Sequence, residues 1–243
     1  MFESLRVKLV KSFVDINEKV FFDNKLSKYY HKAFPQKIKC AIDVGANKGQ
    51  TIDFYLEMNR ECRIYAFEPN SLLFEKLTRK YLPFDQIEIF NAGISDKAGQ
   101  KTFNENIFDY TSTFEELDFD SQYAKRKSKI LGVKPEEMIK RRYSVDVTTL
   151  SHFINNHVKA PINILKIDTE GHEFACLSGL FEGRLNHTIS RIQIENHNDD
   201  MYANKIPFNM IVDLLDQNGF AVDARIDHSF GNFEEVIFRN TRP

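Results

Sequence analysis

Short apolar runs recur along this chain, separated by segments in which the apolar residues fall on one face of a helix. Five of these runs predict strands, at about 39–44, 63–67, 86–91, 162–167 and 189–194. Helical spacing between the first three runs predicts helices at 48–59 and 71–80. Because strands that alternate with helices form parallel sheets with right-handed crossovers, the pattern predicts an α/β fold.

The end of the chain breaks this alternation. Apolar positions within 208–215 predict a helix that ends at Gly219, and two further apolar runs follow at 220–226 and 233–239. The join at 227–232 is too short for a crossover, so these two strands pair antiparallel. We therefore expect a mainly parallel, seven-stranded sheet that ends in an antiparallel hairpin.

Two segments lie outside this pattern. Residues 1–35 have helical spacing with many lysines, and we expect them to pack on the sheet, to join a homodimer or to contact a membrane peripherally. Residues 104–142 change from acidic to basic and interrupt the pattern between the third and fourth strands. They form either a solvated face or a lid and substrate wall. The predicted organisation is a helical segment, 1–35, followed by one α/β domain, 36–243.

Composition disfavours several classes of protein. Charged residues make up 28% and hydrophobic residues 42% of the 243 residues, as in an ordinary globular protein. The net charge of −2 gives no field that points to nucleic acid. No apolar run reaches the roughly 18 residues of a transmembrane helix, and basic residues interrupt the N-terminal stretch where a signal peptide would be continuous. We therefore expect a cytoplasmic protein with three buried, reduced cysteines, Cys40, Cys62 and Cys176.

The first strand leads into the most informative segment of the chain. Asp43 ends the strand, and the loop 45–49 then reads Gly-Ala-Asn-Lys-Gly before a helix begins. Glycines permit positive φ and close backbone approach, and the helix offers unsatisfied N–H groups to a ligand. A dinucleotide fingerprint has glycine where Asn47 stands, and a P-loop needs a Lys-Ser/Thr pair after its last glycine. The loop therefore favours a nucleoside without a phosphate chain, such as S-adenosylmethionine; the alternative is a glycine turn without function.

Acidic and small residues follow the second and third strands. Glu68 lies 23 residues after Gly45, about where doubly wound sheets place the acid that binds ribose hydroxyls; the alternative is a surface carboxylate. After the third strand, 91–93 reads Asn-Ala-Gly, which suits the wall of an adenine slot. The predicted cofactor-binding residues are Asp43, Gly45, Ala46, Asn47, Gly49, Phe67, Glu68, Pro69, Asn91, Ala92 and Gly93.

The fourth strand ends in a group of ionisable residues. Lys166 is unusual in a strand buried on both faces, so it needs a carboxylate partner or a cleft. Asp168, Glu170 and His172 then cluster where the sheet opens to a ligand, and a histidine among carboxylates can take a proton from a hydroxyl. The alternative is that the acids and histidine only cap the N-terminus of the next helix.

The fifth strand adds a second polar set at the same edge. Glu195 and His197 share a face by strand periodicity. Asp168, Glu195 and Asn196 together offer oxygen ligands that suit Mg²⁺, which would lower the pKa of a substrate hydroxyl. A metal-free histidine or carboxylate base fits equally well, and a zincin-type zinc motif is absent from the sequence.

Four motifs occur in order along residues 40–198: Asp-Val-Gly-Ala-Asn-Lys-Gly, Phe-Glu-Pro, Leu-Lys-Ile-Asp-Thr-Glu-Gly-His-Glu and Ile-Glu-Asn-His. With these motifs, the segment resembles the FkbM family of S-adenosylmethionine-dependent methyltransferases. The resemblance implies a Rossmann-like class I methyltransferase fold for 36–243 and O-methylation of a hydroxyl on a sugar, glycan or secondary metabolite. It carries cofactor contacts onto Asp43, Gly45, Asn47, Gly49 and Glu68, and site roles onto Lys166, Asp168, Glu170 and Glu195.

Methyl transfer needs alignment, exclusion of water and removal of the hydroxyl proton. The side chains that we expect around the acceptor hydroxyl, with one as base or metal ligand, are those of Lys166, Asp168, Glu170, His172, Glu195 and His197. Two other functions stay open: a non-catalytic nucleotide-binding module that docks an anionic partner through 125–142, and an NAD(P)-dependent oxidoreductase, which the glycine spacing disfavours.

Overall fold

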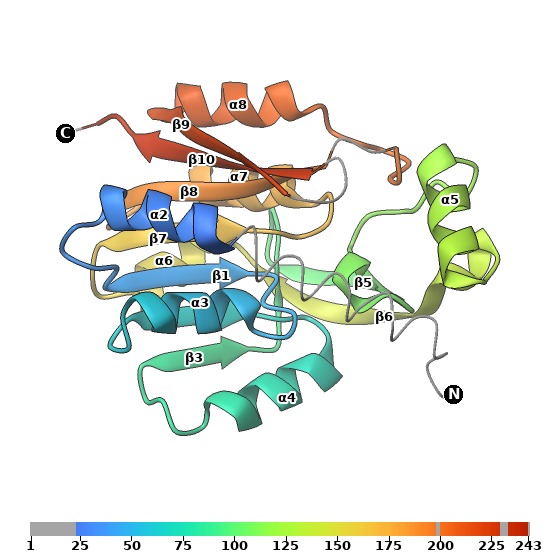
Figure 1. Ribbon diagram of the computed structural model, residues 1–243, viewed down its shortest axis with the longest axis horizontal. Coiled ribbons are helices and arrows are strands. Elements are labelled where there is room, and N and C mark those ends of the chain that lie inside the picture. Colours follow the sequence, from blue (N-terminus) through green and yellow to red (C-terminus); the bar gives the residue numbers. More distant parts are fainter. Residues whose placement is uncertain (1–22, 198–199, 229–232, 243) are drawn as a thin grey trace.

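The computed structural model describes residues 23–197, 200–228 and 233–242. Its centre is a sheet with the strand order β3-β2-β1-β7-β8-β10-β9 (Figure 1). The strands are β1 (Cys40–Val44), β2 (Arg63–Phe67), β3 (Ile87–Phe90), β7 (Ile162–Ile167), β8 (Ile189–His197), β9 (Phe220–Asp227) and β10 (Phe233–Asn240). Within the described sheet, β10 alone runs in the direction opposite to the other six strands. The predicted seven-stranded sheet with its terminal hairpin is confirmed.

Helices cover both faces of this sheet. Their bounds are α2 (Asp23–Ala33), α3 (Gln50–Met58), α4 (Ser71–Tyr81), α6 (Leu150–His157), α7 (Glu173–Phe181) and α8 (Phe208–Gln217). Alternate residues of β1 enter two separate cores: Ile42 packs with α6, α7 and α8, whereas Ala41 packs with α2, α3 and α4. Since side chains of a strand alternate between faces, the residues in step with Ala41, including Asp43, lie under α2 and α3.

A second, three-stranded sheet stands beyond one end of the main sheet, together with α5 (Gln122–Leu131) (Figure 1). It consists of β4 (Gly93–Ile94), β5 (Gly99–Asn106) and β6 (Ile139–Thr148), in the order β4-β6-β5. Two short 3₁₀ turns, η2 (Asp109–Thr111) and η3 (Pro135–Met138), join these elements. The sequence pattern predicts none of these strands, because β5 and β6 are mostly polar and lack the apolar alternation of a buried strand.

The N-terminal segment is described only from residue 23, so most of the predicted segment 1–35 lies outside the described residues. Its described part, α2, packs on the main sheet: Leu26 and Tyr30 are buried, and the Tyr30 hydroxyl donates a hydrogen bond to Gln193 Oε1. The three cysteines are buried and free, as predicted. Among the described helices, none has the length and apolar character that crossing a bilayer would require.

Candidate functional site

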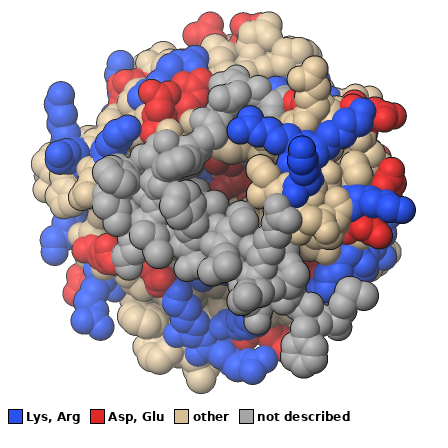
Figure 2. All heavy atoms as spheres, turned by 45° about the vertical axis from the view of Figure 1, so that its right-hand side comes forward, with Lys and Arg blue, Asp and Glu red and all other residues tan. Residues whose placement is uncertain are grey.

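The carboxyl ends of β1, β2, β7 and β8 open into a cavity of about 720 Å³. Its other walls come from the second sheet and its connections, and from the start of β10. Figure 2 faces this end of the molecule and shows acidic side chains at the bottom of a hollow, with lysines and arginines beside its mouth. The cavity lies in the range of about 300–1,000 Å³ that is typical of small-molecule sites.

The glycine-rich loop after β1 is shaped by contacts within the protein. Gly45 and Gly49 have φ of 90° and 84°, which favour glycine. A Cβ on Gly45 would lie 1.9 Å from the Asp168 carbonyl oxygen, and one on Gly49 would lie 2.4 Å from the Tyr81 hydroxyl. Both glycines are therefore required by close packing of the loop on neighbouring backbone and side chains, a reason that the sequence analysis did not foresee.

Glu68, at the end of β2, is buried on the cavity wall. Its carboxyl oxygens accept hydrogen bonds from the backbone N–H groups of Asn47 and Asn70, each over 2.7 Å. Burial raises the pKa of Glu68 to about 8, although these two hydrogen bonds lower it. The carboxyl thus ties the glycine-rich loop to the second strand and still has acceptor positions for a ligand.

Eight of the predicted cofactor residues line the cavity: Gly45, Ala46, Asn47, Phe67, Glu68, Pro69, Ala92 and Gly93. Within the described structure, the other three, Asp43, Gly49 and Asn91, lie off its wall. Asp43 is fully buried beneath the loop. Burial raises its pKa to about 6, against the lowering effect of Lys166. The Asn91 amide donates to the carbonyl oxygens of Glu68 and Pro69, so it shapes the turn after β2.

Lys166 lies in the middle of the sheet, where parallel pairing places it beside Asp43 on one side and Gln193 on the other. It is nearly buried, and its ammonium group donates to Asp168 Oδ2 over 2.7 Å. Burial alone lowers the pKa of Lys166, but the carboxylates of Asp168, Asp43 and Glu235 raise it above its ordinary value. The expectation that this lysine needs a carboxylate partner is confirmed, and it also lines the cavity.

Three predicted carboxylates meet at the adjacent strand ends. Oxygens of Asp168, Glu170 and Glu195 all lie within 4.8 Å of one another, and all three residues line the cavity. Glu170 has a φ of 55°, and its carboxylate accepts a hydrogen bond from the Tyr202 hydroxyl over 2.7 Å. The tertiary structure therefore concentrates negative charge at the ends of β7 and β8, on the other side of β1 from Glu68.

His172 occupies a different place from the one expected of a base. It is buried; its Nε2 lies 2.9 Å from Ser95 Oγ, and its Nδ1 lies 2.5 Å from Glu115 Oε1. In the described structure it does not line the cavity. The neighbouring Glu173 accepts hydrogen bonds from the backbone N–H groups of Thr169 and Gly171, so the helix-cap interpretation applies to Glu173.

The remaining predicted residues follow β8. The Asn196 amide donates to Glu234 Oε1 over 2.9 Å, and Asn196 lies off the cavity wall in the described structure, unlike Glu195. The structure therefore does not bring Asn196 together with Asp168 as a magnesium ligand set. The side chain of His197 lies outside the described residues.

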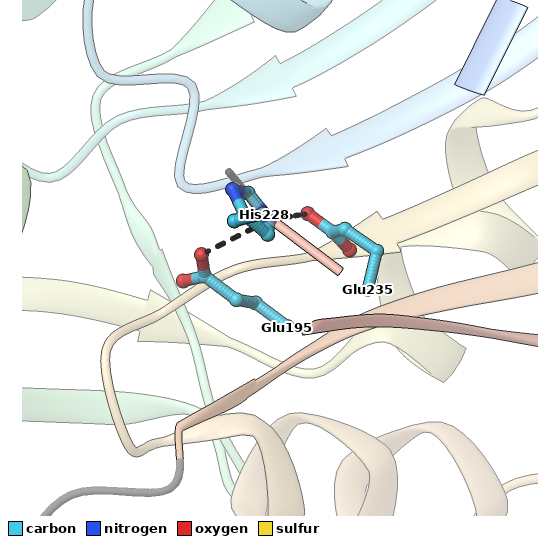
Figure 3. A group of neighbouring side chains, drawn as sticks. All are labelled: Glu195, His228 and Glu235. Carbon is cyan, nitrogen blue, oxygen red and sulfur yellow. Dashed lines mark ion pairs between the residues drawn. The ribbon is translucent and has the colours of Figure 1, made fainter. Parts of the chain in front are cut away.

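Two further ionisable residues reach the cavity from the C-terminal hairpin, and the sequence analysis did not select them. His228 follows β9, and Glu235 lies on β10. His228 Nε2 is 3.7 Å from Glu195 Oε1 and 3.7 Å from Glu235 Oε1 (Figure 3). The sequence does contain a sign that Glu235 is unusual. Strand alternation places its charged side chain on the same face as the apolar Ile237, which is buried.

Comparison with known proteins identifies the family of this chain. The model of the family described as "Methyltransferase FkbM domain" matches residues 43–222. The chain is 24% identical over 203 residues to the 2-O-methyltransferase NoeI of Sinorhizobium fredii, covering 83% of this chain and 79% of NoeI. It is 26% identical over 207 residues to the AMB antimetabolite synthetase AmbE of Pseudomonas aeruginosa, covering 76% of this chain and 10% of AmbE. A solved S-adenosylmethionine-dependent methyltransferase from Aquifex aeolicus is 12% identical, with a TM-score of 0.49 and coverage of 97% and 98%.

Proposed function

Because the chain belongs to the FkbM methyltransferase family, we propose that it transfers a methyl group from S-adenosylmethionine to a hydroxyl of a sugar, glycan or secondary metabolite. The observation that carries the proposal is one continuous cavity that is lined both by Glu68, after β2, and by the carboxylates of Asp168, Glu170 and Glu195, near the carboxyl ends of β7 and β8. The relative NoeI, named as a 2-O-methyltransferase, supports oxygen as the acceptor atom.

The cofactor half of the cavity has the groups that an adenosyl ligand requires. Glu68 offers acceptor oxygens for ribose hydroxyls, and the wall around Ala92 and Gly93 is small and apolar enough for an adenine ring. Asn47 Oδ1 is buried and has no hydrogen-bond partner among the described residues, so a donor group on the ligand would satisfy it. S-adenosylmethionine, when bound, supplies an electrophilic methyl group on its sulfonium.

The acceptor half provides the proton acceptor. Lys166 holds Asp168 through a hydrogen bond of 2.7 Å, and Tyr202 holds Glu170 in the same way. We assign the general-base role to Asp168, because the buried ammonium fixes the orientation of its carboxylate on the cavity wall. Glu170 and Glu195 would then accept hydrogen bonds from other hydroxyls of the acceptor and align it for in-line attack.

The insertion forms the wall that would contact the acceptor. Segment 108–114 and α5 line the cavity with aromatic rings, among them Phe108, Tyr110 and Tyr123, and with Lys127. Aromatic faces and a cation suit a sugar or another polyhydroxylated acceptor that also carries an anionic group. The proposal includes the substrate-wall role of 104–142 and a cytoplasmic location; for 1–35, packing on the sheet, a homodimer and peripheral membrane contact are the expected alternatives.

A magnesium-assisted form of the same reaction would use Asp168, Glu170 and Glu195. Their oxygens lie within 4.8 Å of one another, and carboxylates are the ligands that magnesium prefers. In that form the ion would lower the pKa of the acceptor hydroxyl, and Asp168 would act as a ligand. Activity of the protein stripped with a chelator, with and without added Mg²⁺, separates the two forms.

The proposal is tested by calorimetric titration with S-adenosylhomocysteine and, in parallel, with NAD, followed by transfer of a labelled methyl group to sugars and glycans. We expect binding of the first compound and label on a hydroxyl oxygen. Glu68→Ala should abolish binding, whereas Glu75→Ala, which alters an exposed carboxylate of α4, should not. Binding of NAD alone would favour the oxidoreductase, and binding of S-adenosylhomocysteine without transfer to any acceptor would favour the non-catalytic module.

A further inference from the structure

Two glutamates face each other across the antiparallel pair of β8 and β10. Glu195 and Glu235 are direct partners in the register, and both line the cavity. Glu235 is 2% exposed, so its carboxyl is almost out of reach of bulk water. Like charges directly opposite each other in a sheet are destabilising, and burial increases the cost. A positive group between the two carboxyls would remove this repulsion.

His228 lies between the two glutamates, and its distance from each of them is longer than that of a hydrogen bond. Its Nε2 is 3.7 Å from an oxygen of each glutamate, and Figure 3 shows the two glutamates reaching toward the ring from different strands. Hydrogen bonds of this kind span about 2.7–3.2 Å. Two atoms that bind one metal ion at about 2.1 Å lie about 3.0–3.8 Å apart at coordination angles of about 90–130°. The spacing is thus that of ligands around a common ion.

Glu235 supplies a second observation that points to a ligand. Its Oε2 is buried and has no hydrogen-bond partner among the described residues. A buried carboxylate oxygen without a partner carries an uncompensated desolvation cost, and a cation offsets it. One ligand atom from each of the three residues lies within 4.8 Å of the others. An ion bound by them would have its open coordination positions toward the cavity.

We propose that Glu195, His228 and Glu235 bind one divalent transition-metal ion of the Mn²⁺ or Zn²⁺ kind. A set of one imidazole nitrogen and two carboxylates suits these ions, whereas magnesium and calcium prefer oxygen ligands throughout. An imidazole binds a metal ion through a nitrogen lone pair, so the ion would be held by the neutral form of His228. Binding of the ion does not depend on the proposed function. A role for the ion in holding an oxygen of the methyl acceptor does depend on it.

The experiment measures metal binding in the absence of any methyl donor. The full chain is stripped with a chelator, dialysed and titrated with Mn²⁺, with free Mn²⁺ followed by electron paramagnetic resonance; Zn²⁺ is titrated by calorimetry. We expect one ion per chain. His228→Gln and Glu235→Gln should each weaken binding at least tenfold, because each removes one of three protein ligands.

Two variants serve as matched controls. His152→Ala removes an exposed histidine of α6 and should leave metal affinity unchanged. Asp168→Asn removes a carboxylate of the neighbouring set, which shares Glu195, and should also leave it unchanged. Circular dichroism and S-adenosylhomocysteine binding show that each variant is folded. His228→Gln and Glu235→Gln each remove a different ligand of the site, so the test stands if either variant folds.

Two results would overturn the proposal. One is the failure of the wild-type chain to bind either ion in a stoichiometric amount, which would mean that protonated His228 alone neutralises the two glutamates. The other is loss of binding in Asp168→Asn with full binding in His228→Gln, which would move the ion to the neighbouring set. Metal binding by a chain that fails to bind S-adenosylhomocysteine would contradict the proposed function and leave this inference intact.

Discussion

Lys166 Nζ donates a hydrogen bond of 2.7 Å to Asp168 Oδ2, across two residues that share one face at the end of β7. Lys166 is also the register partner of the fully buried Asp43 on β1, and the charge of each residue shifts the pKa of the other. One cation therefore serves two carboxylates, one below the glycine-rich loop and one at the acceptor half of the cavity. This relationship links the stability of the sheet to the orientation of the proposed base.

Removing the Asp168 carboxylate is expected to separate binding from chemistry. Asp168→Asn keeps the shape of the side chain but cannot accept the proton, so the methyl-transfer rate should fall about 10²–10⁴-fold. The affinity for S-adenosylhomocysteine should stay within about twofold, because the substitution removes a charge but little volume and leaves in place the Asp168 backbone that packs on Gly45. Single-turnover transfer of a labelled methyl group and calorimetry measure the two quantities. Unchanged turnover would remove Asp168 from the mechanism.

Removing the Lys166 cation is expected to destabilise the fold. Lys166→Met leaves Asp43 buried without its neighbouring cation, and loss of one member of a buried pair costs about 3–5 kcal/mol. Urea denaturation followed by circular dichroism measures the change in the free energy of unfolding. Adding Asp43→Asn to this variant should recover part of the loss, because the isolated charge is gone. A double variant no more stable than Lys166→Met would show that the two residues do not interact.

Glu68 should make the stability of the protein depend on pH. Burial raises its pKa from 4.5 to about 8, so the folded state holds a proton that the unfolded state releases. Its contribution is therefore fully present below about pH 4.5 and is lost as the pH rises toward 8. Buried Asp43, whose pKa is raised to about 6, acts in the same direction.

Glu68→Gln tests this dependence. Urea midpoints at pH 5, 6, 7 and 8 should decline less steeply than in the wild type, and the slope that Asp43 causes should remain. The variant should also be less stable at pH 5. Two backbone N–H groups now donate hydrogen bonds to the Glu68 carboxyl, and the amide nitrogen of glutamine would face one of them without being able to accept its hydrogen bond. Parallel curves for the two proteins would contradict the raised pKa.

His172 is expected to act through structure alone. His172→Ala removes its contacts with Ser95 and Glu115, which join β4, the insertion and α7, so the free energy of unfolding should fall by about 1–3 kcal/mol. The pH profile of methyl transfer should keep its shape at a temperature where the variant is folded. Loss of a titration step from that profile would instead return His172 to the list of bases.

The main sheet and half of the site could be predicted from local sequence. Buried parallel strands are short continuous apolar runs, so β7, with the sequence Ile-Asn-Ile-Leu-Lys-Ile, stands out from its polar surroundings. Because the carboxyl ends of parallel strands meet at one edge, residues that directly follow them, such as Asp168 and Glu68, had to lie near a common cavity. The second sheet could not be predicted in this way, since β5 and β6 expose much of their length and carry polar residues.

Tertiary structure alone decided which ionisable side chains face one another. His172 and Asp168 are four residues apart, yet one is enclosed by Ser95 and Glu115 and the other lines the cavity, because the chain turns between them at two residues of positive φ, Glu170 and Gly171. Glu235 meets Glu195 only through the antiparallel return of β10, whose register sets the pair. A sequence specifies which residues end each strand; contacts between residues far apart in the chain depend on how the strands pair and how the helices pack on them.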